Sequence, residues 1–324
     1  MRARTLGAMT LGLMLVAAPA AAATDAAFTD WLAAFRSEAA AKGITPATIE
    51  AALTGLEPIP RVIELDQKQP ERTVTFEDYI ARILSPTRIA NGRAKLAEHS
   101  AVLAEVSQRF GVPARFIVAL WGIETSYGGY TGSFPVIGAL ATLAWEGRRA
   151  DYFRGELLAA LKIVDQGHVQ PAGMMGSWAG AMGHSQFMPS SFLAYAIDWN
   201  GDGAKDIWGT HADVFASAAN YLKSVGWREE LTWGREVKLP ANFATADADL
   251  KVAKTLAAWQ AMGVRRADGG DLPARDLSAS IVLPGGPGGP AYLVYDNYRS
   301  IMRWNRSLYF ATSVGLLADR IGAP

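Results

Sequence analysis

The sequence predicts a mainly α-helical protein of the α+β class, with one small β-containing insertion. Apolar residues make up 50% of the 324 residues, enough to bury a large core. Most of the chain carries them at helical spacing, as the first stretch shows with Phe28, Trp31, Leu32 and Phe35. Residues 231–296 instead run or alternate in the manner of short strands, which predicts the insertion.

Residues 1–23 have the organisation of an export signal. Two arginines precede an apolar run from residue 6 to residue 18, and three alanines end at Ala23, where we expect cleavage. A short buried helix or a membrane anchor is the alternative, but the run is below the ~20 residues that cross a bilayer. We therefore expect a periplasmic protein without a membrane span.

The charge balance gives no sign of a polyanionic partner. Lysine and arginine total 31 and aspartate and glutamate total 31, so nucleic acid is not expected as a ligand. There is no cysteine, which excludes disulfides and a lipid anchor on cysteine, so we expect the core alone to hold the fold.

After the signal, the chain divides into four parts that differ in hydrophobic pattern and in proline and glycine content. Residues 24–110 are broken repeatedly by proline and glycine, which predicts several short helices. Residues 111–230 continue the helical pattern with glycine-rich loops between helices, and 231–296 form the β-containing part. Residues 297–324 are again helical and aromatic, and we expect them to pack back on the first helical part.

One glutamate stands in an apolar and aromatic run, "LWGIETSYGG". Pro113 is suited to start a helix and Gly128-Gly129 to end it, so Glu124 falls on the last turn. Leu120 and Trp121, at i−4 and i−3, share its face, and no lysine or arginine lies three or four residues away.

Such surroundings predict a raised pKa for Glu124. Apolar neighbours and the negative end of the helix dipole both disfavour the carboxylate. A glutamate that keeps its proton near neutral pH is suited to protonate a glycosidic oxygen as a general acid. The alternative is a helix-end glutamate that points into water.

Residues 176–191, "GSWAGAMGHSQFMPSS", have the composition of a binding loop. Glycine and alanine allow a ligand to approach the backbone, and Ser177 and Gln186 offer hydrogen bonds to hydroxyl or acetamido groups. Trp178 and Phe187 offer rings for stacking on sugar faces. The alternative is a tight structural loop whose polar groups satisfy its own backbone.

Residues 198–209, "DWNGDGAKDIWG", match the first half of an EF-hand calcium loop. Position 12 is Gly209, where that motif places a bidentate glutamate. The loop either binds calcium weakly, in a structural role, or is a series of Asx turns that needs no ion. Ligands at positions 1, 3, 5, 7 and 9 would be Asp198, Asn200, Asp202, the carbonyl of Ala204, and Asp206.

Other candidates are weaker. His184 lies inside the glycine-rich loop but lacks any triad or metal-ligand spacing, so we expect a groove-lining or surface residue. The same holds for His99, His168 and His211. The absence of an HExxH motif argues against a zinc amidase or peptidase.

Several strings together resemble the lytic murein transglycosylase B family. "GIETSYG", "GSWAGAMGHSQFMPSSF", "DWNGDG", "ANYLKSVGW" and "NYRSIMRWNRS" follow the order and rough separations found there, over about residues 28–320. The resemblance implies a lysozyme-like helical core. It also implies cleavage of peptidoglycan between N-acetylmuramic acid and N-acetylglucosamine, with a 1,6-anhydromuramoyl product.

The resemblance also assigns roles to residues. Glu124 becomes the single catalytic acid and base, with no cofactor needed for the chemistry, and Asp213 closes the possible calcium loop. The implied sugar-subsite residues are Ser177, Gln186, Phe187, Tyr221 and Asn305, and Arg148 and Arg149 would face the peptide stem.

Two other functions stay open. A hydrolytic muramidase needs a second carboxylate, and Asp151 and Asp165, which lie among charged neighbours, are better suited to salt bridges or solvent. A non-catalytic, calcium-stabilised peptidoglycan-binding module is the other alternative. Protein partners among cell-wall enzymes are not identified by the sequence.

Overall fold

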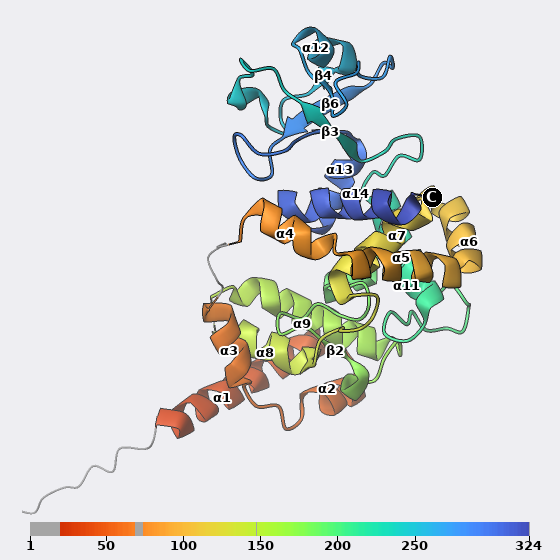
Figure 1. Cartoon of the computed structure of the whole chain (residues 1–324). Helices are drawn as coiled ribbons and strands as arrows, with labels where there is room; N and C mark the ends of the chain where they lie inside the picture. Colours follow the sequence, from red (N-terminus) through yellow and green to blue (C-terminus); the bar gives the residue numbers. More distant parts are fainter. Residues whose placement is uncertain (1–19, 69–73, 147, 324) are drawn as a thin grey trace, which may run out of the picture.

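The computed structural model describes residues 20–68, 74–146 and 148–323 (Figure 1). Most of the expected export signal lies outside the described residues, and its last alanines begin the first helix. The expectation of a mainly α-helical fold with a small β-containing part is confirmed, and its strands form antiparallel sheets. Among the described helices, none combines the length and apolar character that a membrane crossing requires.

The first three helices pack away from the next three. Helices α1, α2 and α3 lie against α8 and α9, whereas α4, α5 and α6 lie with α7, α11 and α14 (Figure 1). Proline at the first turn starts several of these helices, as at Pro46 and Pro86, where Thr45 and Ser85 cap the free backbone N–H groups. The bounds are α1 Ala20–Ala41, α2 Pro46–Leu53, α3 Pro60–Gln67, α4 Phe76–Ile83, α5 Pro86–Glu98 and α6 Ser100–Phe110.

The central region supplies the helix that carries Glu124 and the loops around it. Two short strands, β1 and β2, pair antiparallel between its helices. The bounds are α7 Ala114–Thr125, β1 Phe134–Pro135, α8 Val136–Glu146, α9 Ala150–Asp165, the 3-10 turn Pro171–Gly173, β2 Met175–Gly176, α10 Pro189–Tyr195 and α11 His211–Ser224.

The β-containing part is a five-stranded antiparallel sheet in the order β4-β6-β7-β3-β5. It has its own apolar cluster around Trp259, Ile281 and Leu293, which lies within residues 231–295. The bounds are β3 Gly234–Lys238, the 3-10 turn Thr245–Asp247, β4 Lys254–Thr255, α12 Leu256–Ala261, β5 Arg265–Arg266, β6 Ser278–Val282 and β7 Ala291–Val294.

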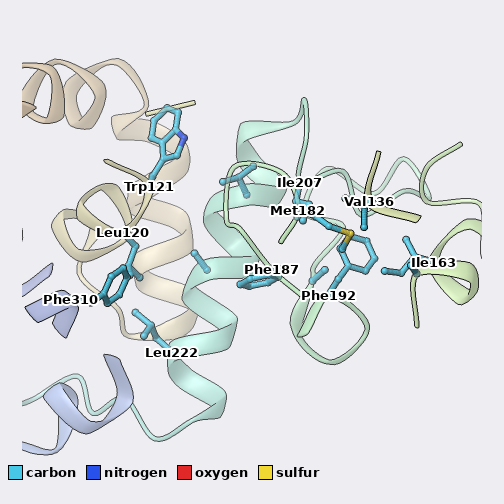
Figure 2. Packing of buried hydrophobic residues seen from close by; sticks show 14 of the residues in the cluster. Leu120, Trp121, Val136, Ile163, Met182, Phe187, Phe192, Ile207, Leu222 and Phe310 are labelled. Atoms are coloured by element: carbon cyan, nitrogen blue, oxygen red, sulfur yellow. The ribbon is translucent and has the colours of Figure 1, made fainter. Parts of the chain in front are cut away.

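The C-terminal helices return to the helical body. Helix α13, Asp296–Trp304, leads from the sheet to α14, Leu308–Gly322, which packs on α4, α5 and α7. Figure 2 shows that one apolar core is continuous from Phe310 on α14 and Leu120 on α7, past Leu222 on α11 and Phe187, to Ile163 on α9. The glycine-rich loop is therefore held by the same core that holds the glutamate helix.

Candidate active site

Helix α7 ends at an unusual turn directly after Glu124. The sequence placed its end at Gly128-Gly129, but the helix stops at Thr125 because Ser126 and Tyr127 are left-handed, with φ of 52° and 60°. For residues other than glycine this conformation costs about 1–2 kcal/mol each.

Contacts of Tyr127 offset that cost. Its hydroxyl donates to the carbonyl of Arg88 on α5 at 2.8 Å. Its ring lies against Gly122, where a Cβ would come within 2.5 Å of the ring atoms. The turn after Glu124 is thus locked to a neighbouring helix, and the carboxylate is held on a rigid element.

Glu124 faces a small cavity of about 10 Å³ with mostly apolar walls. The indole N–H of Trp304 donates to its Oε1 at 2.8 Å. Burial raises the pKa of Glu124 to about 7, and the hydrogen bond from Trp304 opposes the rise without cancelling it. Among the described residues that line this cavity, Glu124 is the only carboxylate. The raised pKa predicted from the apolar helix face is confirmed, and the side chain does not point freely into water.

An aromatic group stands beside this carboxylate. Trp304 packs on Tyr221 at 4.8 Å and on Phe187 at 5.2 Å between ring centroids, and Tyr221 packs on Tyr195 at 4.6 Å. Phe187 is only 3% exposed, so it supports the other two rings and offers little face of its own. Tyr221 is half-buried, and its hydroxyl donates to the carbonyl of Arg303 at 2.7 Å.

In the glycine-rich loop, both polar candidates bond to backbone. Ser177 Oγ accepts from the N–H groups of Ala179 and Ala181, at 3.3 and 3.0 Å. The Gln186 amide nitrogen donates to the carbonyls of Thr131 and Gly183, at 3.0 and 2.9 Å. These bonds match the structural interpretation of the loop, yet both side chains are only partly buried. Ser177 retains its O–H as a donor for a ligand, and Gln186 retains its Oε1 as an acceptor.

His184 connects the glycine-rich loop to helix α7 by a hydrogen bond. Its Nδ1 accepts from the indole N–H of Trp121 at 2.9 Å, and its ring fills the space beside Gly128, where a Cβ would be 2.3 Å from Cε1. Burial and then the nearby His211 lower its pKa, in keeping with a neutral ring that accepts a hydrogen bond. The sequence identified His184 as a groove-lining or surface residue; it lines the cavity and also joins two elements.

The two arginines expected at the peptide stem share one buried carboxylate. Arg148 donates to both oxygens of Asp66 at 2.6 Å, and Arg149 donates to Oδ1 at 2.9 Å. Asp66 is 1% exposed, whereas both arginines are about half exposed. Hydrogen bonds from Arg148 lower the pKa of Asp66 most strongly. Asp66 first, and also the nearby charge of Glu146, raise the pKa of Arg148, so this arginine faces two carboxylates.

The remaining acidic and amide candidates lie elsewhere. Asn305 follows Trp304 directly and is exposed. Asp165 accepts from Thr45 and Thr48 at the start of α2, a capping role, and Asp151 lies in the first turn of α9. Neither aspartate lines the cavity of Glu124.

The aspartate loop is closed by its own backbone. Asp198 accepts from the N–H groups of Gly201 and Gly203, at 2.7 and 2.9 Å. Asp202 binds the side chain of Asn200 and the N–H of Ala204. The loop is thus a chain of Asx turns.

Its end is closed in the same way. Asp206 accepts from Trp208 and Gly209, and Asp213, fully buried, accepts from Trp199 and Asp206, both at 2.8 Å. Across the described ranges, no group of three or more acidic or histidine side chains is arranged to hold a metal ion. The donor types suit calcium, but the oxygens in this arrangement are turned to backbone N–H groups.

Two site residues were missed by sequence reasoning. The sequence predicted a site role for Asn305 but not for the adjacent Trp304, which lies 180 residues along the chain from the Glu124 that it contacts. Tyr79 on α4 lies near enough that the charge of Glu124, after burial, raises its pKa. Neither residue has a local signal in the sequence, because its proximity to Glu124 depends on how distant helices pack.

The chain is similar to known proteins. The family model described as Transglycosylase SLT domain matches residues 27–319. Membrane-bound lytic murein transglycosylase B of Escherichia coli (strain K12) is 32% identical over 251 residues, which cover 75% of this chain. The chain spans 66% of that relative's length.

Solved structures show the same fold. SltB3 from Pseudomonas aeruginosa, in complex with NAG-anhNAM-pentapeptide, has 47% identity and a TM-score of 0.89, and the match covers 91% of this chain and 79% of that one. Escherichia coli SLT35 in complex with calcium has 28% identity and a TM-score of 0.77, with 90% and 92% covered. The family expected from the sequence strings is confirmed: the chain belongs to the Transglycosylase SLT domain family and is similar to lytic transglycosylase B enzymes.

Proposed function

We propose that this protein is a lytic transglycosylase that cleaves peptidoglycan between N-acetylmuramic acid and N-acetylglucosamine, with Glu124 as the single acid and base. The observation that carries the proposal is a lone carboxyl group, with a pKa raised to about 7, beside an aromatic group. A related structure, that of SltB3, is bound to an anhydromuramoyl saccharide with a pentapeptide, which is the product class proposed here.

The chemistry needs one carboxyl group and no cofactor. Protonated Glu124 donates its proton to the glycosidic oxygen, and the bond from that oxygen to C1 of the muramic acid breaks. The 2-acetamido group of the substrate stabilises the positive charge at C1. The Glu124 carboxylate then takes the proton of the 6-hydroxyl as this oxygen bonds to C1, which closes the 1,6-anhydro ring and restores the acid.

A raised pKa serves both steps. Below pH 7 most molecules hold the proton that the first step needs, and Trp304 stabilises the carboxylate formed by it. Hydrolysis by two carboxylates would need a partner about 5–10 Å away, and no other carboxylate of the described residues lines this cavity.

The surrounding residues are proposed to bind the strand. We assign Ser177, through its O–H, and Gln186, through its Oε1, to hydroxyl and acetamido groups. Tyr221 and Asn305 are assigned to sugar contacts beside Trp304. Phe187 acts by supporting these rings. Arg148 and Arg149 face the peptide stem with the exposed parts of their guanidinium groups.

Location and calcium belong to the same proposal. Residues 1–23 direct export, so the protein works in the periplasm. The aspartate loop binds calcium weakly and structurally. SLT35, a related protein, has been solved in complex with calcium. Here the loop from Asp198 to Asp213 presents the carboxylate and amide oxygens that calcium prefers, and binding requires its carboxylates to turn from backbone N–H groups to the ion.

Digestion of purified sacculi tests the function. Mass analysis of the released fragments distinguishes anhydromuramoyl ends from reducing ends, which are heavier by one water. We expect anhydro ends from the parent protein and none from Glu124→Gln. Reducing ends would favour a muramidase, and binding without release would favour a non-catalytic module.

A further inference from the structure

A second hollow is lined by Tyr221 of the aromatic group beside Glu124. It has a volume of about 580 Å³, within the usual range of ligand sites, and is open to solvent. Tyr221 connects this hollow to the surroundings of Glu124, because it lines the hollow and packs on Trp304, which donates a hydrogen bond to Glu124. We call it the arginine groove, and its polar walls are Tyr195, Tyr221, Arg299, Arg303 and Arg306.

The arginine groove is positively charged although the protein as a whole is neutral. Three arginines and no carboxylate of the described residues line it, whereas basic and acidic side chains balance over the full chain. Arg299 has a structural role, since it donates to the carbonyl of Leu250 and to Ser280 Oγ, and its Nε lies 3.6 Å from Asp296. It joins α13 to the sheet and builds one wall.

Arg303 and Arg306 have no such role. Among the described residues, neither guanidinium has a hydrogen-bond or ion-pair partner, and both residues are exposed. Arg303 lies in the last turn of α13, where the helix dipole favours a cation, and only its carbonyl is engaged, by Tyr221. Two unpaired guanidinium groups beside tyrosine hydroxyls are suited to bind carboxylates.

We propose that the arginine groove binds the carboxylates of the peptide stem, through Arg303 and Arg306, while the sugar to which the stem is attached lies at Glu124. This inference rests on the proposed function, since it requires a peptidoglycan strand in the site. Every uncross-linked stem ends in a free carboxylate, and the groove begins one aromatic side chain away from the catalytic carboxyl. It is separate from the Arg148 and Arg149 pair, whose guanidinium groups are both paired with Asp66.

The test compares ligands with and without the stem. Binding of a disaccharide pentapeptide and of the matching disaccharide is measured by calorimetry on the full chain, for the parent, Arg303→Gln and Arg306→Gln. Arg275→Gln, at an exposed arginine in the β-containing part, is the matched control. Arg306→Lys, which keeps the charge, is the conservative variant.

We expect each glutamine variant to lose about three- to tenfold in affinity for the pentapeptide ligand relative to the disaccharide. Arg306→Lys restores part of the loss and Arg275→Gln shows none. In strand cleavage the same variants raise KM for stem-bearing strands more than they lower kcat, because the contact is the same in ground and transition states.

An unchanged preference for the pentapeptide ligand in both glutamine variants overturns the inference, as does an equal loss in Arg275→Gln. A parent protein that releases no anhydro ends refutes the proposed function instead. The calorimetric comparison still decides the arginine groove in that case, because binding does not depend on turnover.

Discussion

Replacement of Glu124 by glutamine should stabilise the protein at neutral and alkaline pH while it removes the catalytic proton. Glutamine has the same shape, and its Oε1 still accepts the indole N–H of Trp304. What disappears is the ionisation of a partly buried group whose pKa desolvation raises from 4.5 to about 7. The variant therefore isolates the free-energy cost of that ionisation from the cost of packing.

The sign follows from proton linkage. The folded state binds the proton of Glu124 more tightly than the unfolded chain does. Ionisation therefore leaves the free energy of unfolding unchanged below pH 4.5 and lowers it progressively as pH rises to 7. Above pH 7 the loss of stability is constant. At about 1.4 kcal/mol for each pKa unit, the full cost is roughly 3 kcal/mol. Because the side chain is only partly buried by accessible area, we expect about 2–3 kcal/mol, as an order of magnitude.

Urea unfolding of the parent and of Glu124→Gln between pH 4.5 and 8.5 measures this difference. Glu105→Gln, at an exposed glutamate on α6, serves as the control and should differ from the parent by little at any pH. A gain from Glu124→Gln that is equally large at pH 4.5 and pH 8.5, or no gain at all, would refute the assignment of a buried, proton-holding carboxyl group.

The remaining predictions use the same contacts. Between pH 7 and 9, kcat/KM on sacculi should fall about tenfold per pH unit as Glu124 ionises. Trp304→Phe should move this fall to higher pH, because it removes a hydrogen-bond donor to the carboxylate. A profile that stays flat to pH 9 contradicts both predictions. Asp66→Ala should lower the free energy of unfolding in urea by about 2–3 kcal/mol, because Arg148 and Arg149 lose a buried partner. A loss below about 0.5 kcal/mol would mean that the ion pairs with Asp66 are not formed. Calcium at 10 mM should raise Tm by about 1–4 °C and chelation should leave cleavage intact; loss of activity on chelation would make the ion essential to the site around residues 198–213.

Local sequence was sufficient for the helix that carries the glutamate. Pro113, the apolar run and the glycines after it place Glu124 on the last turn, and the absence of a nearby cation predicts its raised pKa. The position on the helix is a property of a few neighbouring residues. The rise in pKa also needs burial, which residues of other elements such as Phe215 and Trp304 supply by lining the cavity. The end of the helix was placed three residues too late, because the left-handed turn at Ser126 and Tyr127 is stabilised by a contact with Arg88.

Residue type alone was insufficient for the loops. The composition of residues 176–191 favoured a binding loop and a structural loop about equally, and the backbone hydrogen bonds of Ser177 and Gln186 are compatible with both. His184 carried no motif, yet it connects this loop to α7 through Trp121. Whether a polar side chain serves its own loop or a neighbour depends on which element is packed beside it.

The sequence by itself determined the helical class, the family and the catalytic candidate, because these follow from periodicity and from short motifs. The tertiary structure decided which partners surround that candidate. Trp304 meets Glu124 across 180 residues, and Asp66 meets Arg148 across 82. The arginine groove likewise unites residues from α10, α11 and the end of α13. Such pairs are set by the packing of helices around a common core, a long-range property that no local window of sequence contains.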